Sequence, residues 1–167
     1  MELKKMTDEM RKKIKLYAKS KRDISDLIKG YSLKKEDLSR CIIKDLSNRE
    51  YTNFSKARLS YAILGEEGKN TDVSGSNFSK CNFRGARFLG NWIARNCNFR
   101  DATFVGAYIP HIEYQYADLR GAILCNTTFL FGTNKAKGAK LDKRIFEALM
   151  EIYDTDFEIE FKPKCKE

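Results

Sequence analysis

Large apolar residues recur at every fifth position through the middle of the chain. There are 15 such centres between residues 54 and 129, and in 13 cases the residue two places earlier is Ala, Cys, Ser or Thr. A fixed internal period indicates a repeat architecture, in which each repeat buries its apolar side only against its neighbours. The centres are Phe54, Leu59, Leu64, Val73, Phe78, Phe83, Phe88, Ile93, Phe99, Phe104, Ile109, Tyr114, Leu119, Leu124 and Phe129.

A period of five fits neither an α-helix, with 3.6 residues per turn, nor a simple strand, with a period of two. Five residues can form a short extended segment and a turn, with two side chains directed to the same interior. Coils of such segments, stacked about 4.8 Å apart, would satisfy each other's backbone hydrogen-bonding groups. The pattern therefore predicts an all-β solenoid.

Three runs of five residues carry a more specific signal. They are Ser-Asn-Phe-Ser-Lys at 76–80, Cys-Asn-Phe-Arg-Gly at 81–85 and Ala-Asp-Leu-Arg-Gly at 117–121. These runs resemble the pentapeptide-repeat family, whose pattern is a small residue, Asp or Asn, Leu or Phe, and two mostly polar residues. The resemblance extends over about residues 52–131. It implies a right-handed quadrilateral β-helix of about four coils, with one pentapeptide on each side.

Four pentapeptides per coil predict four columns of stacked centres. Two interruptions break the register: four extra residues within 65–70, before the third column, and one extra residue at Asn96, after it. The expected columns are, first, Leu59, Phe83, Phe104 and Leu124; second, Leu64, Phe88, Ile109 and Phe129; third, Val73, Ile93 and Tyr114; and fourth, Phe54, Phe78, Phe99 and Leu119.

The N-terminal segment, residues 1–44, is expected to be a basic helical cap. Thr7 precedes two acids and then several cations, the charge order that a helix dipole favours. Met6, Met10, Ile14 and Tyr17 form an apolar stripe on this helix. A second helix is expected at residues 23–29, with Ile24, Leu27 and Ile28 directed inward and Gly30 at its end. Leu38, Ile43 and Leu46 resemble imperfect repeats whose register the sequence does not fix.

The β-helix itself is expected at residues 45–131, followed by a C-terminal element at 132–167. Apolar spacing predicts a helix at about residues 140–153. Alternation of Phe157, Ile159 and Phe161 with acids predicts one half-buried strand. Helices at both ends would cover the unpaired edges of an open β-helix, which otherwise invite aggregation.

Cysteine usage and hydropathy favour a cytoplasmic protein. Of five cysteines, Cys41, Cys81 and Cys97 occupy apolar or inward positions, so we interpret them as core residues in a reducing compartment. No apolar run approaches the ~20 residues of a membrane span, and the Lys-rich start lacks the apolar core of a secretory signal. With His111 as the only histidine and no zinc-finger cysteine spacing, neither a metal nor another cofactor is expected.

The formal charge of +9 is concentrated at the start of the chain. Residues 1–44 contain 14 Lys and Arg against 7 Asp and Glu, whereas residues 45–131 contain 10 against 8. The basic N-terminal helix could bind phosphates weakly, but such runs are more often solvated helix faces. Nucleic acid is therefore not the expected partner, and weak binding through that helix is kept as an alternative.

The resemblance implies a second alternative. Some pentapeptide-repeat proteins protect DNA gyrase from quinolones or toxins as acidic DNA mimics that dimerise. Four coils would need on the order of 12 negative charges to imitate DNA of the same length, but this repeat segment is at +2. Under this alternative, the chain would form a homodimer through its C-terminal helix.

The residues do not assemble a plausible catalytic set. His111 and Glu113 could share one face of an extended segment, but no Ser or Cys nucleophile occupies a matching position. The chain is therefore expected to be a non-enzymatic scaffold that binds an unidentified protein.

The expected docking surface is the irregular third column. Trp92, the only tryptophan, and Glu113 are expected to project outward, while Asn91 and Ile112 take the inward positions usually held by small residues. Tyr108, Tyr116 and His111 complete the candidate partner-binding residues. Alternatively, Trp92 is covered by the loop at residues 65–70 or by a terminal helix.

Overall fold

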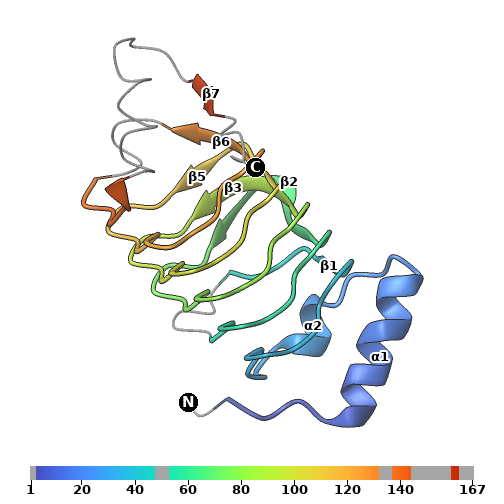
Figure 1. Cartoon of the computed structure of the whole chain (residues 1–167). Helices are drawn as coiled ribbons and strands as arrows, with labels where there is room; N and C mark the ends of the chain where they lie inside the picture. Colours follow the sequence, from blue (N-terminus) through green and yellow to red (C-terminus); the bar gives the residue numbers. More distant parts are fainter. Residues whose placement is uncertain (1–2, 48–52, 132–136, 144–158, 162–167) are drawn as a thin grey trace.

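A computed structural model describes residues 3–47, 53–131, 137–143 and 159–161. Among the described residues, two helices come first and are followed by a stack of coils with strands along it (Figure 1). The helices are α1 (Asp8–Lys19) and α2 (Ser25–Ile28). The strands are β1 (Ile42–Ile43), β2 (Ile63–Asp72), β3 (Arg87–Ile93), β4 (Tyr108–Ile109), β5 (Ile112–Glu113), β6 (Thr128–Phe131) and β7 (Ile159–Phe161).

Backbone pairing places the repeat centres in columns. The strands β1, β2, β3, β4 and β6 pair in parallel, so Ile43, Leu64 and Phe88 align in the second column. Isolated parallel bridges join residues 37, 58, 82, 103 and 123, each just before a centre of the first column. A second series joins residues 53, 77, 98, 118 and 140, just before the centres of the fourth. The first, second and fourth columns are therefore confirmed.

Stacked aromatic rings fill the fourth column. Phe54 and Phe78 are stacked with centroids 4.7 Å apart, and Phe78 and Phe99 with centroids 5.2 Å apart. All three are buried. Each ring therefore packs against the ring of the coil before it, which makes burial in one coil depend on the next.

Where Asp or Asn precedes a centre, its side chain stabilises the turn that follows. Its side-chain oxygen accepts a hydrogen bond from the backbone N–H two residues later, as Asn77 does from Ser79 and Asn98 from Arg100, both at 3.0 Å. The same bond forms at residues 23, 37, 45, 53, 72, 82 and 118. This Asx turn explains why the pattern requires a short side chain with an acceptor oxygen there.

The small residue two places before each centre lets adjacent coils approach. Ala57, Ala62, Ala86, Ala102 and Ala107 are all buried in this position. Polar residues there donate to a carbonyl of the preceding coil: Cys81 to Phe54 at 2.8 Å and Thr127 to Phe104 at 2.6 Å. Cys41, Cys81 and Cys97 are buried free thiols, as predicted, whereas Cys125 is disulfide-bonded.

The third column departs from the predicted register. Backbone pairs join Thr71 to Trp92 and Trp92 to Ile112, so Ala94, not Ile93, lies between Val73 and Tyr114. The Val73 N–H correspondingly donates to the Ile93 carbonyl. The prediction that Ile93 is a centre was therefore wrong, and the extra residue lies before this position instead of at Asn96.

The structure contains both helices predicted near the start of the chain. Thr7 caps α1 by accepting a hydrogen bond from the Met10 N–H, and Met6 and Ile14 are buried, with Met10 and Tyr17 packed against the core. Ile24 and Ile28 of α2 are fully buried. Leu33, Leu38 and Ile43 lie in the core at five-residue intervals, so the coils start before residue 45.

At the other end, β7 pairs antiparallel with β6, which confirms the predicted strand at Ile159 and Phe161. Most of the helix predicted at about residues 140–153 lies outside the described residues, as does Phe157.

The fourth column provides the test of this packing. Phe99→Ala should lower the free energy of unfolding by about 3–5 kcal/mol, because the cavity lies between two stacked coils. The matched control is Ile123→Ala, which removes an exposed apolar side chain and should change stability by less than ~0.5 kcal/mol. Equal thermal midpoints for the two variants would contradict the column assignment.

Candidate functional site

Both irregularities of the repeat meet at one corner, just before the third column. The register of β2 against β3 shifts between Gly65 and Asn70. Gly65 and Gly90 lie in close backbone contact there and both have positive φ. A Cβ on Gly65 would collide with the Leu89 carbonyl, and one on Gly90 with the carbonyls of Glu66 and Lys69. The inserted residues of one coil therefore stack directly on the extra residue of the next.

Trp92 lies inside the coil, so the prediction that it projects outward was wrong. Its side chain is 2% exposed, its indole N–H donates to the Leu89 carbonyl at 3.1 Å, and its ring packs edge-on against Phe88. The alternative of a covered Trp92 was correct: the Cβ position of Gly65 lies 3.1 Å from its indole nitrogen. The extra residue moves Trp92 into the inward position that small residues usually hold.

Large and small side chains change places in this coil, which makes room for the Trp92 ring. In the same coil the column centre is Ala94, which is small and fully buried. In the preceding coil Thr71 underlies Trp92, and in the following coil Ile112 covers it. Interior volume is thus conserved while large and small residues change places.

Outside the buried ring, a shallow hollow of about 220 Å³ opens on the surface of the third column. It is lined by Asn70, Asn91, Trp92, Ile93, His111, Ile112 and Glu113. Predicted candidates Trp92, His111 and Glu113 therefore come together, although Trp92 contributes only to the floor. The hollow is smaller than typical small-molecule pockets of about 300–1,000 Å³.

Asn70 and Asn91 were not among the predicted site residues. The Asn91 amide donates to the Asn70 side-chain oxygen at 3.2 Å, which links two successive coils along the hollow. The sequence signal was present, because both asparagines flank the insertions. The wrong register instead placed Asn91 in the interior, whereas it is exposed.

Glu113 pairs with Arg95, whose guanidinium donates to the Glu113 carboxylate at 2.6 Å. The same guanidinium donates to Gln115 at 3.2 Å. Both members of the ion pair are partly exposed, so its contribution to stability is small. Tyr108 and Tyr116 are exposed by 42% and 53%; neither lines the hollow.

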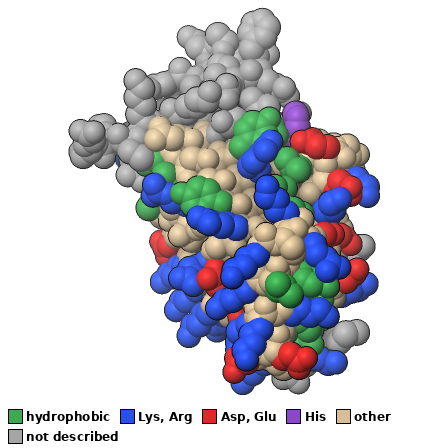
Figure 2. Space-filling view, turned by 90° about the vertical axis from the view of Figure 1, so that its right-hand side faces the viewer, with side chains coloured by type: hydrophobic (Ala, Val, Ile, Leu, Met, Phe, Trp, Pro, Cys, Tyr) green, Lys and Arg blue, Asp and Glu red, His purple; other side chains and the backbone are tan. Residues whose placement is uncertain are grey.

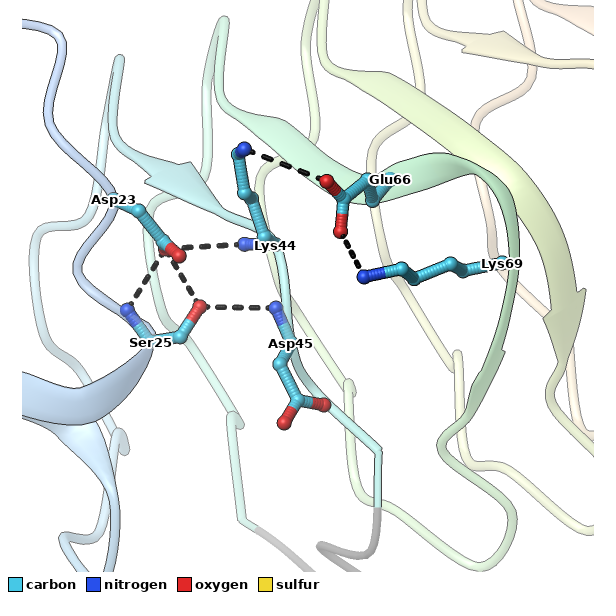
Figure 3. Close-up of polar contacts among 6 residues, drawn as sticks. All are labelled: Asp23, Ser25, Lys44, Asp45, Glu66 and Lys69. Carbon is cyan, nitrogen blue, oxygen red and sulfur yellow. Dashed lines mark hydrogen bonds and ion pairs between the residues drawn. The ribbon is translucent and has the colours of Figure 1, made fainter.

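A polar network holds the insertion beside the hollow (Figure 3). Glu66 accepts hydrogen bonds from Lys69 at 2.6 Å and from Lys44 at 3.5 Å. The bond from Lys69, and then the charges of Lys69 and Lys44, hold the pKa of Glu66 below its usual value. The insertion is therefore tied to the coil before it.

The same network continues to the start of the chain. Asp23 accepts hydrogen bonds from the backbone N–H groups of Ser25 and Lys44, and from the Ser25 hydroxyl at 2.6 Å. The Ser25 hydroxyl oxygen in turn accepts from the Asp45 N–H at 2.9 Å. The start of α2 is thus held to the residues that directly follow β1.

The three buried cysteines are not activated as nucleophiles. Burial raises the pKa of the Cys41, Cys81 and Cys97 thiols to about 12, so they stay protonated at neutral pH. Within residues 3–47, 53–131, 137–143 and 159–161, no three His, Cys, Asp or Glu side chains are grouped to hold a metal ion. In the same residues, no helix has the length and apolar character needed to cross a bilayer.

Comparison with known protein families finds the same kind of repeat. A family model described as pentapeptide repeats matches with 8 copies, at residues 69–90. The chain is a pentapeptide-repeat protein. Its pentapeptide centres and Asx turns are the structural form of that sequence pattern. A search of the curated proteins finds no match.

Several solved structures are similar to this pentapeptide-repeat protein at low sequence identity. One is a pentapeptide repeat protein from the Arabidopsis thaliana thylakoid lumen, with 21% identity and a TM-score of 0.31. That match covers 69% of this chain and 64% of the Arabidopsis protein. Identities this low leave function open, because one fold supports many functions.

Two further structures are similar to this chain. A pentapeptide repeat protein from Nostoc Pcc 7120 has 15% identity and a TM-score of 0.38; the match covers 85% of this chain and 99% of that one. QnrB1, a plasmid-mediated fluoroquinolone resistance protein, has 18% identity and a TM-score of 0.33. That match covers 75% of this chain and 84% of the QnrB1 chain.

The burial of the single tryptophan can be tested by fluorescence. We expect the emission of Trp92 to be blue-shifted in the native protein and protected from acrylamide, because the ring is 2% exposed. Unfolding in denaturant should shift the emission to longer wavelength and restore quenching. Native quenching as strong as that of the unfolded chain would place Trp92 at the surface and contradict this register.

Proposed function

We propose that this pentapeptide-repeat protein is a non-enzymatic scaffold that binds a protein partner at the third-column hollow. The supporting observation is that both insertions of an otherwise regular repeat lie at the corner beside this hollow. Interruptions of a regular scaffold commonly carry function, because loops on a rigid frame can vary without disturbing the core.

The chemistry of the hollow suits a polar protein segment. His111 and Asn91 are exposed and offer hydrogen-bond donors and acceptors, while Ile93 supplies a limited apolar contact. The Glu113–Arg95 pair lies at the rim, where charges contribute more to orientation than to affinity. The floor is rigid, since Trp92 is fixed by its hydrogen bond and by Phe88.

The proposal also covers the shape of the coil, the role of α1 and α2, and the location of the protein in the cell. The four columns and their spacing support a four-sided, right-handed coil, and the burial of Met6, Ile14 and Ile28 supports α1 and α2 as an N-terminal cap. The buried free thiols support a cytoplasmic location, whereas the disulfide at Cys125 bears against it.

The docking surface can be tested with two matched double variants. Asn91→Ala with His111→Ala alters the hollow, and Thr103→Ala with Val105→Ala removes a similar volume near the first column. Both pairs should leave the melting midpoint nearly unchanged, because none of the four side chains is fully buried. A protein recovered by the wild-type chain should be lost only with the hollow variant. Retention by that variant, or equal loss with the control, would refute the site.

The DNA-mimic alternative predicts a different result. A gyrase protector should alter DNA supercoiling, or protect it from a quinolone, at micromolar or lower concentration. We expect no effect, because Lys and Arg outnumber Asp and Glu in the repeats as well as in the N-terminal segment. Clear protection would favour the DNA-mimic function even if the hollow variant failed to lose its partner.

A further inference from the structure

The repeats have a near-neutral total charge, but their acidic residues are distributed unevenly around the coil. Five segments connect first-column centres to second-column centres: residues 39–42, 60–63, 84–87, 105–108 and 125–128. None of them contains Asp or Glu. We call the exposed residues of these segments the second-column surface, which contains Arg40, Tyr61, Arg84, Arg87 and Tyr108.

The arginines of this surface lack acidic partners, whereas five of the other six described arginines have one. Arg11, Lys44, Arg58, Lys69, Arg95, Arg100 and Arg120 each lie within 4.0 Å of a carboxylate. Arg40, Arg84 and Arg87 are in none of the ion pairs found among the described residues. Uncompensated charge of one sign on a rigid wall attracts an anionic partner. Figure 2, which views one side of the molecule, shows Lys and Arg covering more of its described surface than Asp and Glu.

Two tyrosine rings lie among these arginines. Tyr61 is 55% exposed, and its ring lies against the next coil, where the Cβ position of Gly85 would be 2.6 Å from a ring carbon. Its backbone N–H donates to the Arg84 carbonyl at 2.9 Å, so Arg84 is next to the residue that the ring covers, Gly85. Tyr108 is 42% exposed and pairs in the sheet with Arg87.

Backbone strain is also concentrated in cationic residues. Of the ten non-glycine residues with positive φ in the described part of the chain, five are Lys or Arg: Lys21, Lys35, Arg40, Lys56 and Lys80. A left-handed conformation is strained for a residue with a Cβ, and glycine would avoid that strain. Arg40 is the member of this group that belongs to the second-column surface.

From this combination we propose that the second-column surface binds single-stranded nucleic acid. Guanidinium groups bind phosphates through paired N–H donors. Exposed tyrosine rings offer stacking platforms to unpaired bases of any sequence. An acidic peptide would use the arginines but would gain little from the rings, and in a duplex the base faces are covered. The surface is distinct from the third-column hollow, so either proposal can fail alone.

Binding can be measured by fluorescence anisotropy of labelled oligo(dT) and oligo(U) of about 20 nucleotides, over a range of salt concentrations. If three arginines release counterions from a single strand, the slope of log K against log salt should be about −2. The two oligonucleotides show whether the strand is DNA, RNA or either. Double-stranded DNA and polyglutamate serve as competing anions.

Three variants identify the residues responsible. Arg84→Ala with Arg87→Ala should reduce the salt slope to about −0.7. Tyr61→Leu with Tyr108→Leu should weaken binding of the single strands on the order of tenfold, without changing the slope. Arg95→Ala with Arg100→Ala is the matched control: it removes the same charge beside the third and fourth columns and should leave affinity nearly unchanged. Melting curves establish that each variant is folded.

Several results would overturn the proposal. One is the absence of binding at low salt, and another is an equal loss with the Arg95 and Arg100 control. A third is competition by polyglutamate or duplex DNA as strong as by the single strands, with no effect of the tyrosine variant. That result would indicate a general polyanion surface, and the nucleic-acid partner would be wrong.

Discussion

Parallel hydrogen bonds between successive coils are the constraint on which the rest of this structure depends. In the fourth column the N–H groups of Phe54, Phe78 and Phe99 each donate to the coil that follows, all at 2.8 Å. Such bonds form only if every coil returns to the same positions. The constraint explains the stacked rings, the small residues beside them and the Asx turns, since each of these keeps one coil in register with the next.

The same constraint determines where the chain can vary. An added residue must be accommodated at a corner, or every later side chain would change place. Here the four inserted residues of β2 and the single extra residue of β3 stack on each other through Gly65 and Gly90. The interior adjusts by placing Trp92 where small residues lie elsewhere and Ala94 at the centre. The third-column hollow is the outer consequence of that exchange, and for this reason a surface feature and a core rearrangement coincide.

The sequence predicted three of the four columns because period and residue size agreed there. It failed at the third because both Ile93 and Ala94 are apolar, so counting alone allowed the extra residue before or after them. Only backbone pairing distinguishes the two positions. The same pairing determines whether Trp92 and Asn91 are buried or exposed. The hollow therefore could not be predicted correctly, although two of the residues that line it, His111 and Glu113, were among the predicted candidates. The sequence does show that the second-column surface lacks Asp and Glu. A sum of charge along the chain does not reveal this feature, because it appears only when charge is compared around the coil.

The register of the third column can be measured by labelling single cysteines. In the register described above, Ile93 lines the surface hollow and Ala94 is fully buried. Ile93→Cys should react rapidly with a thiol reagent under native conditions, over the background of the parent protein, in which burial raises the pKa of the Cys41, Cys81 and Cys97 thiols to about 12. Ala94→Cys should react only after denaturation. Rapid labelling at position 94 with protection at position 93 would contradict the account.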